Sequence, residues 1–78
     1  CVEDTWGSDI TTAALLHLAA ATDPARVLNT CDLSSYVSPR LAPTAPERAN
    51  GRIAPPEGAG LGIVVDAQAL GAADLTVE

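Results

Sequence analysis

The 78-residue sequence contains no lysine, phenylalanine or methionine, and only one tryptophan and one tyrosine. Hydrophobic residues make up 47% of the chain, but 15 of them are alanine, so large side chains that fill a core are few. Small domains bury a smaller share of their surface than large domains do. A chain with so little apolar area to bury is therefore not expected to be a self-sufficient miniature domain.

Cysteines and long apolar segments are also scarce. Cys1 and Cys31 are too few for the disulfide framework of a secreted miniprotein, which favours a reduced, cytoplasmic setting. The longest apolar run, residues 13–21, is interrupted by His17 and is far shorter than the ~20 residues that cross a bilayer. The sequence enters Val2 directly after Cys1, without the pattern of a signal peptide, so no such segment is expected. Either a leader has been removed or the sequence is the tail of a longer chain. The second interpretation agrees better with the small expected core.

Positive charge is the third scarcity, because four arginines face ten acidic residues and the net charge is −6. A protein that follows nucleic-acid phosphates needs clustered positive charge. An anionic membrane surface repels an acidic protein for the same electrostatic reason. We therefore expect neither nucleic acid nor a membrane as a partner.

The first half of the chain has the pattern of a strand, a helix and a second strand. Residues 1–5 read as the end of a strand, and residues 26–31 as another. Between them, residues 10–21 are strong helix formers, which Ser8 or Asp9 caps and Pro24 ends. The apolar face of this helix is expected at Ile10, Ala13, Ala14, His17, Leu18 and Ala21, with Leu15 and Leu16 beside it.

The second half is mostly irregular, since five of the six prolines lie between residues 38 and 57. A helical turn is expected near Tyr36, and Asn50-Gly51 indicates a tight turn before a short strand at 52–54. Asp66 caps a short helix over 67–70, closed by Gly71. Two strands around one helix fit a right-handed βαβ unit of a parallel sheet, which needs neighbouring strands.

Acidic residues follow both strands, at the edge where parallel α/β folds bind ligands. Asp4 and Asp32 are expected to face one pocket and bind a cationic group or a hydroxyl. Alternatively, each side chain caps the turn that follows its strand. Trp6 either forms a wall of that pocket, where it would stack on a cation, or packs against the protein. Cys31 is expected to be a buried thiol.

Two segments resemble a known family. Residues 2–14 (VEDTWGSDITTAA), followed by His17-Leu18-Ala19, resemble the late barrel of the mandelate racemase/muconate lactonizing enzymes of the enolase superfamily. Residues 50–53 and 60–63, with Asp66, resemble the closing segment of that family, where Ala59 replaces the usual proline. The resemblance covers nearly the whole chain.

The resemblance implies an α/β fold, the C-terminal piece of a (β/α)8 barrel. Residues 1–5 would be the end of the seventh strand, residues 9–21 the seventh helix and residues 26–32 the eighth strand. Residues 1–48 would then form the late barrel segment. Residues 49–78 would be a C-terminal segment that returns to complete the capping domain.

The resemblance also implies metal-assisted removal of a proton next to a carboxylate, in a dehydration or an epimerisation. The Mg²⁺ ligands and the acid/base lysines would lie on strands outside this chain, which therefore holds no catalytic residue or metal ligand and is inactive alone. The Asp-Thr-Trp-Gly block most resembles enzymes such as cis-3-hydroxy-L-proline dehydratases, where acids at the seventh and eighth strand ends hold the substrate amine. By that resemblance, the substrate-binding residues are Asp4, Thr5, Trp6 and Asp32.

The expected partners are a small substrate with a carboxylate, the rest of the same barrel, and further copies in a homo-oligomer. A function of another class stays open from the residues alone. A small acidic chain of this composition also suits a non-enzymatic binding module. An extension upstream of residue 1 separates the two, because the enzyme requires a Lys-x-Lys pair and three spaced acids there.

Overall fold

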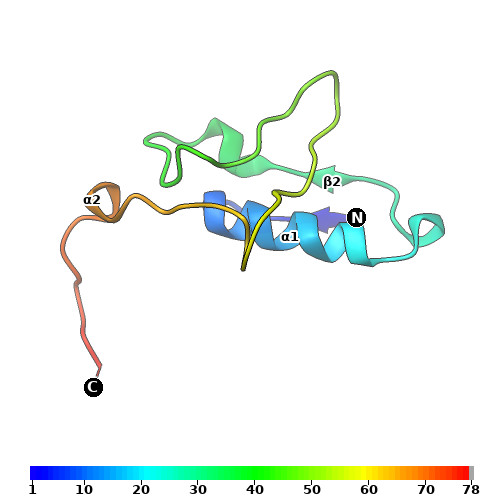
Figure 1. The fold of residues 1–78 in the computed structure, drawn as a ribbon. Helices are drawn as coiled ribbons and strands as arrows, with labels where there is room; N and C mark the ends of the chain where they lie inside the picture. Colours follow the sequence, from blue (N-terminus) through cyan, green and yellow to red (C-terminus); the bar gives the residue numbers. More distant parts are fainter. Residues whose placement is uncertain (78) are drawn as a thin grey trace.

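The computed structural model of the chain describes residues 1–77 (Figure 1). Among these residues, no helix is both long enough and apolar enough to cross a bilayer. A short strand, a long helix and a second short strand form the ordered half, and a long irregular segment follows them. In chain order the elements are β1 (Val2–Glu3), α1 (Asp9–Ala21), a 3-10 turn (Pro24–Arg26), β2 (Thr30–Cys31), a second 3-10 turn (Leu33–Tyr36) and α2 (Ala67–Leu70).

The two strands pair in parallel, with Val2 opposite Thr30 and Glu3 opposite Cys31. Helix α1 contacts both strands, so the predicted strand–helix–strand unit with parallel strands is confirmed (Figure 1). The second strand is shorter than the predicted range 26–31. Residues 24–26 form a 3-10 turn instead, because the Asp23 carboxylate accepts a hydrogen bond from the Ala25 N–H.

Helix α1 begins as predicted, since the Ser8 hydroxyl accepts a hydrogen bond from the Ile10 N–H at 3.2 Å. The predicted apolar face is confirmed only in part: Ala13 is buried, with Leu15 and Leu16 beside it, but other predicted positions are not. Ala14 and Ala21 are exposed, and Leu18 is 60% exposed. The buried face of α1 includes the polar residues Asp9 and Thr12, whose side chains form hydrogen bonds with distant parts of the chain. The face that points inward is therefore rotated relative to the one that apolar side chains alone suggest. The buried residues are Asp9, Thr12, Ala13, Leu15 and Leu16.

The core is small. Its buried apolar side chains are Ala13, Leu15, Leu16 and Ala42. The accessible surface is 5741 Å², whereas a compact monomer of 7.9 kDa exposes roughly 4,400 Å². The radius of gyration is 13.4 Å, against about 11.5 Å for a compact chain of this length. The shortage of core that the composition predicts is therefore confirmed.

The irregular tail is held by isolated hydrogen bonds, to helix α1 and to the irregular segment that precedes the tail. The His17 ring contacts the Leu61 carbonyl oxygen at 3.1 Å, and the Asp66 N–H donates to the Leu41 carbonyl at 2.7 Å. The turn at Asn50-Gly51 forms with both φ angles positive, but the predicted strand after it is reduced to one bridge between Ala49 and Arg52. The chain then leads away from the body past α2 (Figure 1).

The short helix α2 matches its prediction at both ends. Its first turn is capped by the Asp66 carboxylate, which accepts a hydrogen bond from the Gln68 N–H at 2.9 Å. It ends at Gly71, whose φ of 76° lies in the left-handed region that glycine adopts without steric cost.

Candidate substrate-binding site

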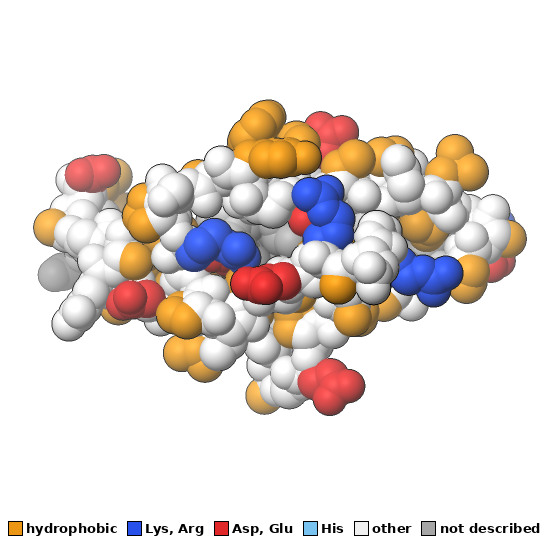
Figure 2. All heavy atoms as spheres, turned by 90° about the horizontal axis from the view of Figure 1, so that it is seen from above, with side chains coloured by type: hydrophobic (Ala, Val, Ile, Leu, Met, Phe, Trp, Pro, Cys, Tyr) orange, Lys and Arg blue, Asp and Glu red, His pale blue; other side chains and the backbone are white. Residues whose placement is uncertain are grey.

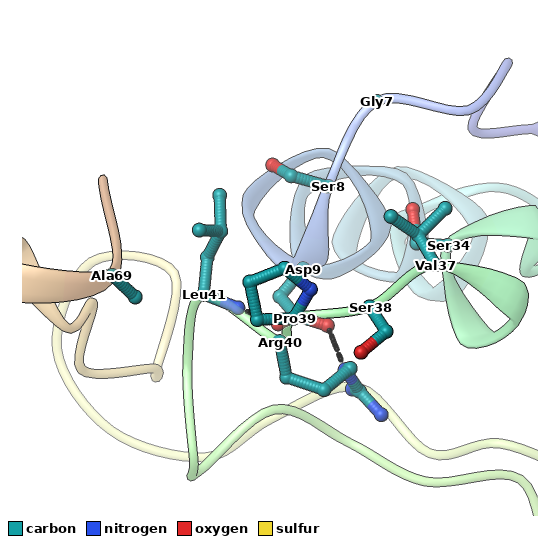
Figure 3. A pocket seen from close by; sticks show the side chains of 10 residues that line it. All are labelled: Gly7, Ser8, Asp9, Ser34, Val37, Ser38, Pro39, Arg40, Leu41 and Ala69. Atoms are coloured by element: carbon teal, nitrogen blue, oxygen red, sulfur yellow. Dashed lines mark hydrogen bonds and ion pairs between the residues drawn. The ribbon is translucent and has the colours of Figure 1, made fainter. Parts of the chain in front are cut away.

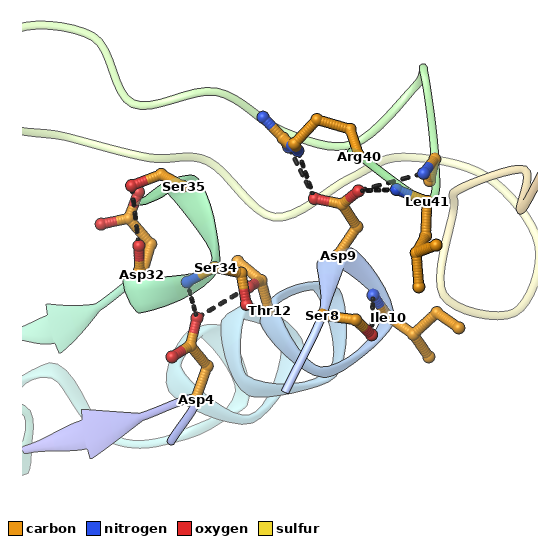
Figure 4. Close-up of polar contacts among 11 residues, drawn as sticks. Asp4, Ser8, Asp9, Ile10, Thr12, Asp32, Ser34, Ser35, Arg40 and Leu41 are labelled. Carbon is orange, nitrogen blue, oxygen red and sulfur yellow. Dashed lines mark hydrogen bonds and ion pairs between the residues drawn. The ribbon is translucent and has the colours of Figure 1, made fainter. Parts of the chain in front are cut away.

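Asp4 lies just beyond the carboxyl end of β1, and its side chain is fully buried. Its Oδ2 accepts hydrogen bonds from the Thr12 hydroxyl and the Ser34 backbone N–H, both at 2.9 Å, and Oδ1 accepts one from the Trp6 N–H at 3.3 Å (Figure 4). Burial acts to raise the pKa of Asp4, but the hydrogen bonds from Ser34, Thr12 and Trp6 together lower it by more, so the pKa lies below its ordinary value. The ionised carboxylate thus joins β1, α1 and the turn after β2.

This geometry gives Asp4 a different role from the one expected from the sequence. A ligand can reach the carboxylate only if the protein's own donors move away. The Trp6 N–H contact closes the turn after β1, as the capping interpretation predicts. The structure therefore favours Asp4 as a residue that positions the loop, not one that touches a ligand directly.

Asp32 lies at the corresponding end of β2, on the strand next to β1. Its backbone carbonyl accepts hydrogen bonds from the Ser35 N–H and hydroxyl, but its side chain makes no capping hydrogen bond (Figure 4). The capping interpretation of the Asp32 side chain is therefore wrong. Its Oδ1 pairs with Arg48 Nη1 at 2.9 Å, and within residues 1–77 its Oδ2 accepts no hydrogen bond. One oxygen remains available to a ligand.

Arg48 and Tyr36 also lie at this candidate site, although no sequence pattern points to them. The Arg48 guanidinium lies 5.9 Å from the centre of the Tyr36 ring, and that ring lies 6.3 Å from the Trp6 ring. Arg48 stands 16 positions after Asp32 in a proline-rich segment, so no local spacing links the two. Together these residues make a row of cation and aromatic rings beside the Asp32 carboxylate.

Thr5 and Trp6 are both exposed, and both have a positive φ, at 50° and 63°. A side chain in this left-handed region costs roughly 1–2 kcal/mol, so the surrounding contacts must hold it there. The contacts to Asp4 do so, since the Gly7 N–H also donates to the Asp4 carbonyl at 3.1 Å. The buried carboxylate therefore fixes how Trp6 is presented.

Two hollows flank the Asp32–Arg48 pair. The larger, about 570 Å³, lies on the β2 side against residues 27–30 and 51–53. The smaller, about 280 Å³, is lined by Tyr36 and Arg40 as well as by the pair itself. Figure 2 shows arginine and acidic side chains gathered around the hollowed middle of this face. The face thus offers charged groups of both signs next to aromatic surface.

Asp9 is a second buried carboxylate whose role the sequence did not indicate. It is 3% exposed, pairs with Arg40 Nη2 at 2.7 Å and accepts the N–H groups of Leu41 and Ala42 at 2.8 and 3.0 Å (Figure 4). Burial acts to raise the pKa of Asp9, but Arg40 and the N–H groups of Ala42 and Leu41 together lower it by more, and the pKa lies below its ordinary value. A hollow of about 220 Å³ adjoins this contact, between Gly7 and the tail (Figure 3).

The described residues do not fit Mg²⁺. Asp4 and Asp9 use their carboxylate oxygens for hydrogen bonds to the protein, and the three side chains that do converge include two thiols. Magnesium requires oxygen ligands. The described residues therefore provide no magnesium site of their own.

Comparison with known proteins decides the family. A family model described as "Enolase C-terminal domain-like" matches residues 1–69. The chain belongs to this family. The cis-3-hydroxy-L-proline dehydratase of Roseibium aggregatum is 45% identical over 62 residues, which are 80% of this chain and 17% of that protein. The chain thus spans about a sixth of the length of this curated relative.

A solved structure agrees with the family match. The mandelate racemase/muconate lactonizing enzyme from Roseovarius nubinhibens ISM is 35% identical to this chain, with a TM-score of 0.79 over 91% of it and 19% of that protein. The resemblance read from residues 2–14 is thereby confirmed, and both relatives are named as enzymes. The division at residues 48 and 49 and the numbering of barrel strands stay predictions.

Proposed function

We propose that these residues act as part of an enolase-superfamily enzyme that removes the proton next to a carboxylate in a proline-derived or related amino or hydroxy acid. The observation that carries the proposal is the position of Asp32 and of the loop held by Asp4, at the carboxyl ends of two adjacent parallel strands. Ligands of parallel α/β folds bind at this edge. The 45% identity to a cis-3-hydroxy-L-proline dehydratase supports this substrate class.

In the proposed site, Asp32 accepts a hydrogen bond from the substrate ammonium through its free Oδ2. The exposed ring of Trp6 covers the same cation, and Thr5 contributes to the rim of the pocket. Asp4 holds the loop that carries both residues. On a 3-hydroxyproline the reaction breaks the C2–H and C3–O bonds, forms a C2–C3 double bond and releases water. An epimerisation instead returns a proton to the opposite face of C2.

The acid/base groups and the Mg²⁺ ligands are proposed to lie outside these residues, in the rest of the barrel. The surface of the described residues supports a larger barrel around them, because nine large hydrophobic side chains are exposed there. The rest of the same barrel and other copies of it are the proposed protein partners. The residues alone are proposed to be inactive. The family match removes the main support for an acidic binding module without enzymatic activity.

The test is an assay of the full-length protein with cis-3-hydroxy-L-proline and Mg²⁺ in D₂O. Proton NMR should show loss of the C2–H signal, through turnover or through exchange with solvent. The N-acetyl derivative, which lacks the cationic nitrogen, is the matched control and should react at least ~30-fold more slowly, the loss of about 2 kcal/mol of charge-assisted hydrogen bonding. Absence of turnover and exchange on all proline-derived acids would contradict the proposal.

A further inference from the structure

Three side chains with metal-binding atoms lie on one face of the strand pair. Successive side chains of a strand point to opposite faces, so Cys1 and Glu3 share a face, and the pairing of Glu3 with Cys31 adds that residue. Cys1 and Glu3 are exposed, and Cys31 is half-buried. Asp4 points to the other face, where it contacts Thr12 of α1. This face is therefore separate from the buried contacts of the helix.

The distances on this face match the requirements of a metal ion. The two sulfur atoms are 3.9 Å apart, and the sulfur atoms and a Glu3 carboxylate oxygen all lie within 4.8 Å of one another. Two thiolates on a tetrahedral zinc ion, each about 2.3 Å from the metal, are separated by roughly 3.8 Å. The thiols therefore need almost no movement to share one ion. A disulfide would instead require the sulfur atoms to approach to about 2.05 Å.

We infer that Cys1, Cys31 and Glu3 form a binding site for a soft divalent cation such as Zn²⁺ or Cd²⁺. The two thiols lose their protons to solvent on binding, and the carboxylate is the third ligand. A fourth tetrahedral position stays open to water or another ligand. Thiolate ligands select such ions over Mg²⁺, so the site is distinct from the one that the superfamily's chemistry requires. The proposed barrel turns this strand face toward its interior, since α1 packs on the outside, but the inference uses none of the proposed substrate-binding residues.

The site links the start of β1 to the end of β2. A bound ion therefore holds the only two strands of the described residues together on the side that α1 does not cover. Since the ion binds the folded strand pair and not the unfolded chain, it should raise the melting temperature of the protein.

The experiment is a titration of the reduced, metal-free, full-length protein with Cd²⁺ and with Zn²⁺, followed by thiolate-to-cadmium absorption and by calorimetry. The expected result is one ion per chain that excess Mg²⁺ does not displace. Cys1→Ser and Cys31→Ser should each weaken binding roughly 100-fold, since a four-ligand zinc site stores about 3 kcal/mol per ligand. Glu3→Gln should weaken it less, and Glu3→Cys should strengthen it.

Glu57→Gln is the matched control, because it removes one acid from an exposed loop and should leave binding unchanged. Circular dichroism of each variant distinguishes loss of the site from loss of the fold. If a serine variant is unstable, Glu3→Gln and Glu3→Cys still test the site, because Glu3 is exposed. Binding that survives both serine variants would overturn the inference. So would a purified protein whose two thiols are already joined, seen as a mass two hydrogens lower and no reaction with a thiol reagent.

Discussion

Replacement of Asp9 by alanine should be far more damaging than its place in the first turn of a helix suggests. The Asp9 carboxylate is the acceptor for the Ala42 N–H, and Ala42 is 2% exposed, so the variant leaves a buried donor without a partner. That loss costs about 1–3 kcal/mol. The Arg40 side chain is 38% exposed and regains water, so the broken ion pair adds at most ~1 kcal/mol. We expect a total loss of about 1–4 kcal/mol.

The assay is urea unfolding of the full-length protein, with Arg40→Ala as the matched control. That control removes the same ion pair but keeps the two backbone hydrogen bonds to Asp9, so it should cost no more than ~1 kcal/mol. Equal losses in the two variants, or a loss below 1 kcal/mol in Asp9→Ala, would refute the assignment of most of the energy to the buried backbone donors.

Lowering the pH should remove the stabilisation that the Asp9 carboxylate gives to the folded protein. The folded-state pKa of Asp9 lies below the ordinary carboxyl value of about 3.9, so the unfolded state binds the proton first as the pH falls. The stabilisation is complete above that ordinary value and disappears as the pH drops through the lowered pKa. The difference in stability between the wild type and Asp9→Asn should therefore be constant near neutral pH and shrink below about pH 4. A difference that grows in acid would contradict the ionised state of Asp9.

Two further predictions concern the fold. The isolated 78 residues should show no cooperative thermal transition and poorly dispersed amide signals, because only four apolar side chains are buried among residues 1–77; a sharp transition would show that the unit folds alone. Gly62→Ala should destabilise the full-length protein by about 1–3 kcal/mol, since a Cβ there meets the Glu57 carbonyl oxygen at 2.7 Å and φ is +71°. Gly60→Ala shares the positive φ but meets no atom within 4 Å, so it should cost only ~1 kcal/mol, and equal losses would show that the contact is unimportant.

Local rules predict the elements of this chain well where one residue type decides the outcome. Ser8 at the start of α1, the Asn50-Gly51 turn and the Asp66 and Gly71 ends of α2 all form as predicted. In each case a single side chain or a glycine satisfies the backbone within a few residues. The signal is therefore contained in the sequence segment itself.

Apolar spacing predicts only part of the inward face of α1, namely Ala13, Leu15 and Leu16. Asp9 and Thr12 are buried because their partners, the residue 41–42 backbone and Asp4, come from distant parts of the chain. Hydrophobicity alone assigns such residues to the solvent side. The same limit hid the role of Asp9, whose partners lie more than 30 positions away.

The candidate site was predictable in position and not in detail. The ends of two adjacent strands brought Asp4 and Asp32 to one edge, as parallel topology requires. The Ser34 N–H donates to the Asp4 carboxylate, whereas Arg48 pairs with Oδ1 of Asp32 and leaves its Oδ2 free. These two contacts decide which carboxylate keeps a free oxygen. Those two contacts are set by the path of an irregular loop, which no periodicity describes.

The most direct test of the account is the measurement of both kcat/KM and melting temperature for Asp32→Asn in the full-length protein. Loss of a charge-assisted hydrogen bond to a desolvated ammonium costs about 2–3 kcal/mol, so kcat/KM on the amino-acid substrate should fall about 30- to 150-fold. The ion pair to the 44% exposed Arg48 contributes little, so stability should change by less than ~1 kcal/mol. An Asp32→Asn protein that melts early yet turns over normally would contradict the assignment of Asp32 to substrate binding.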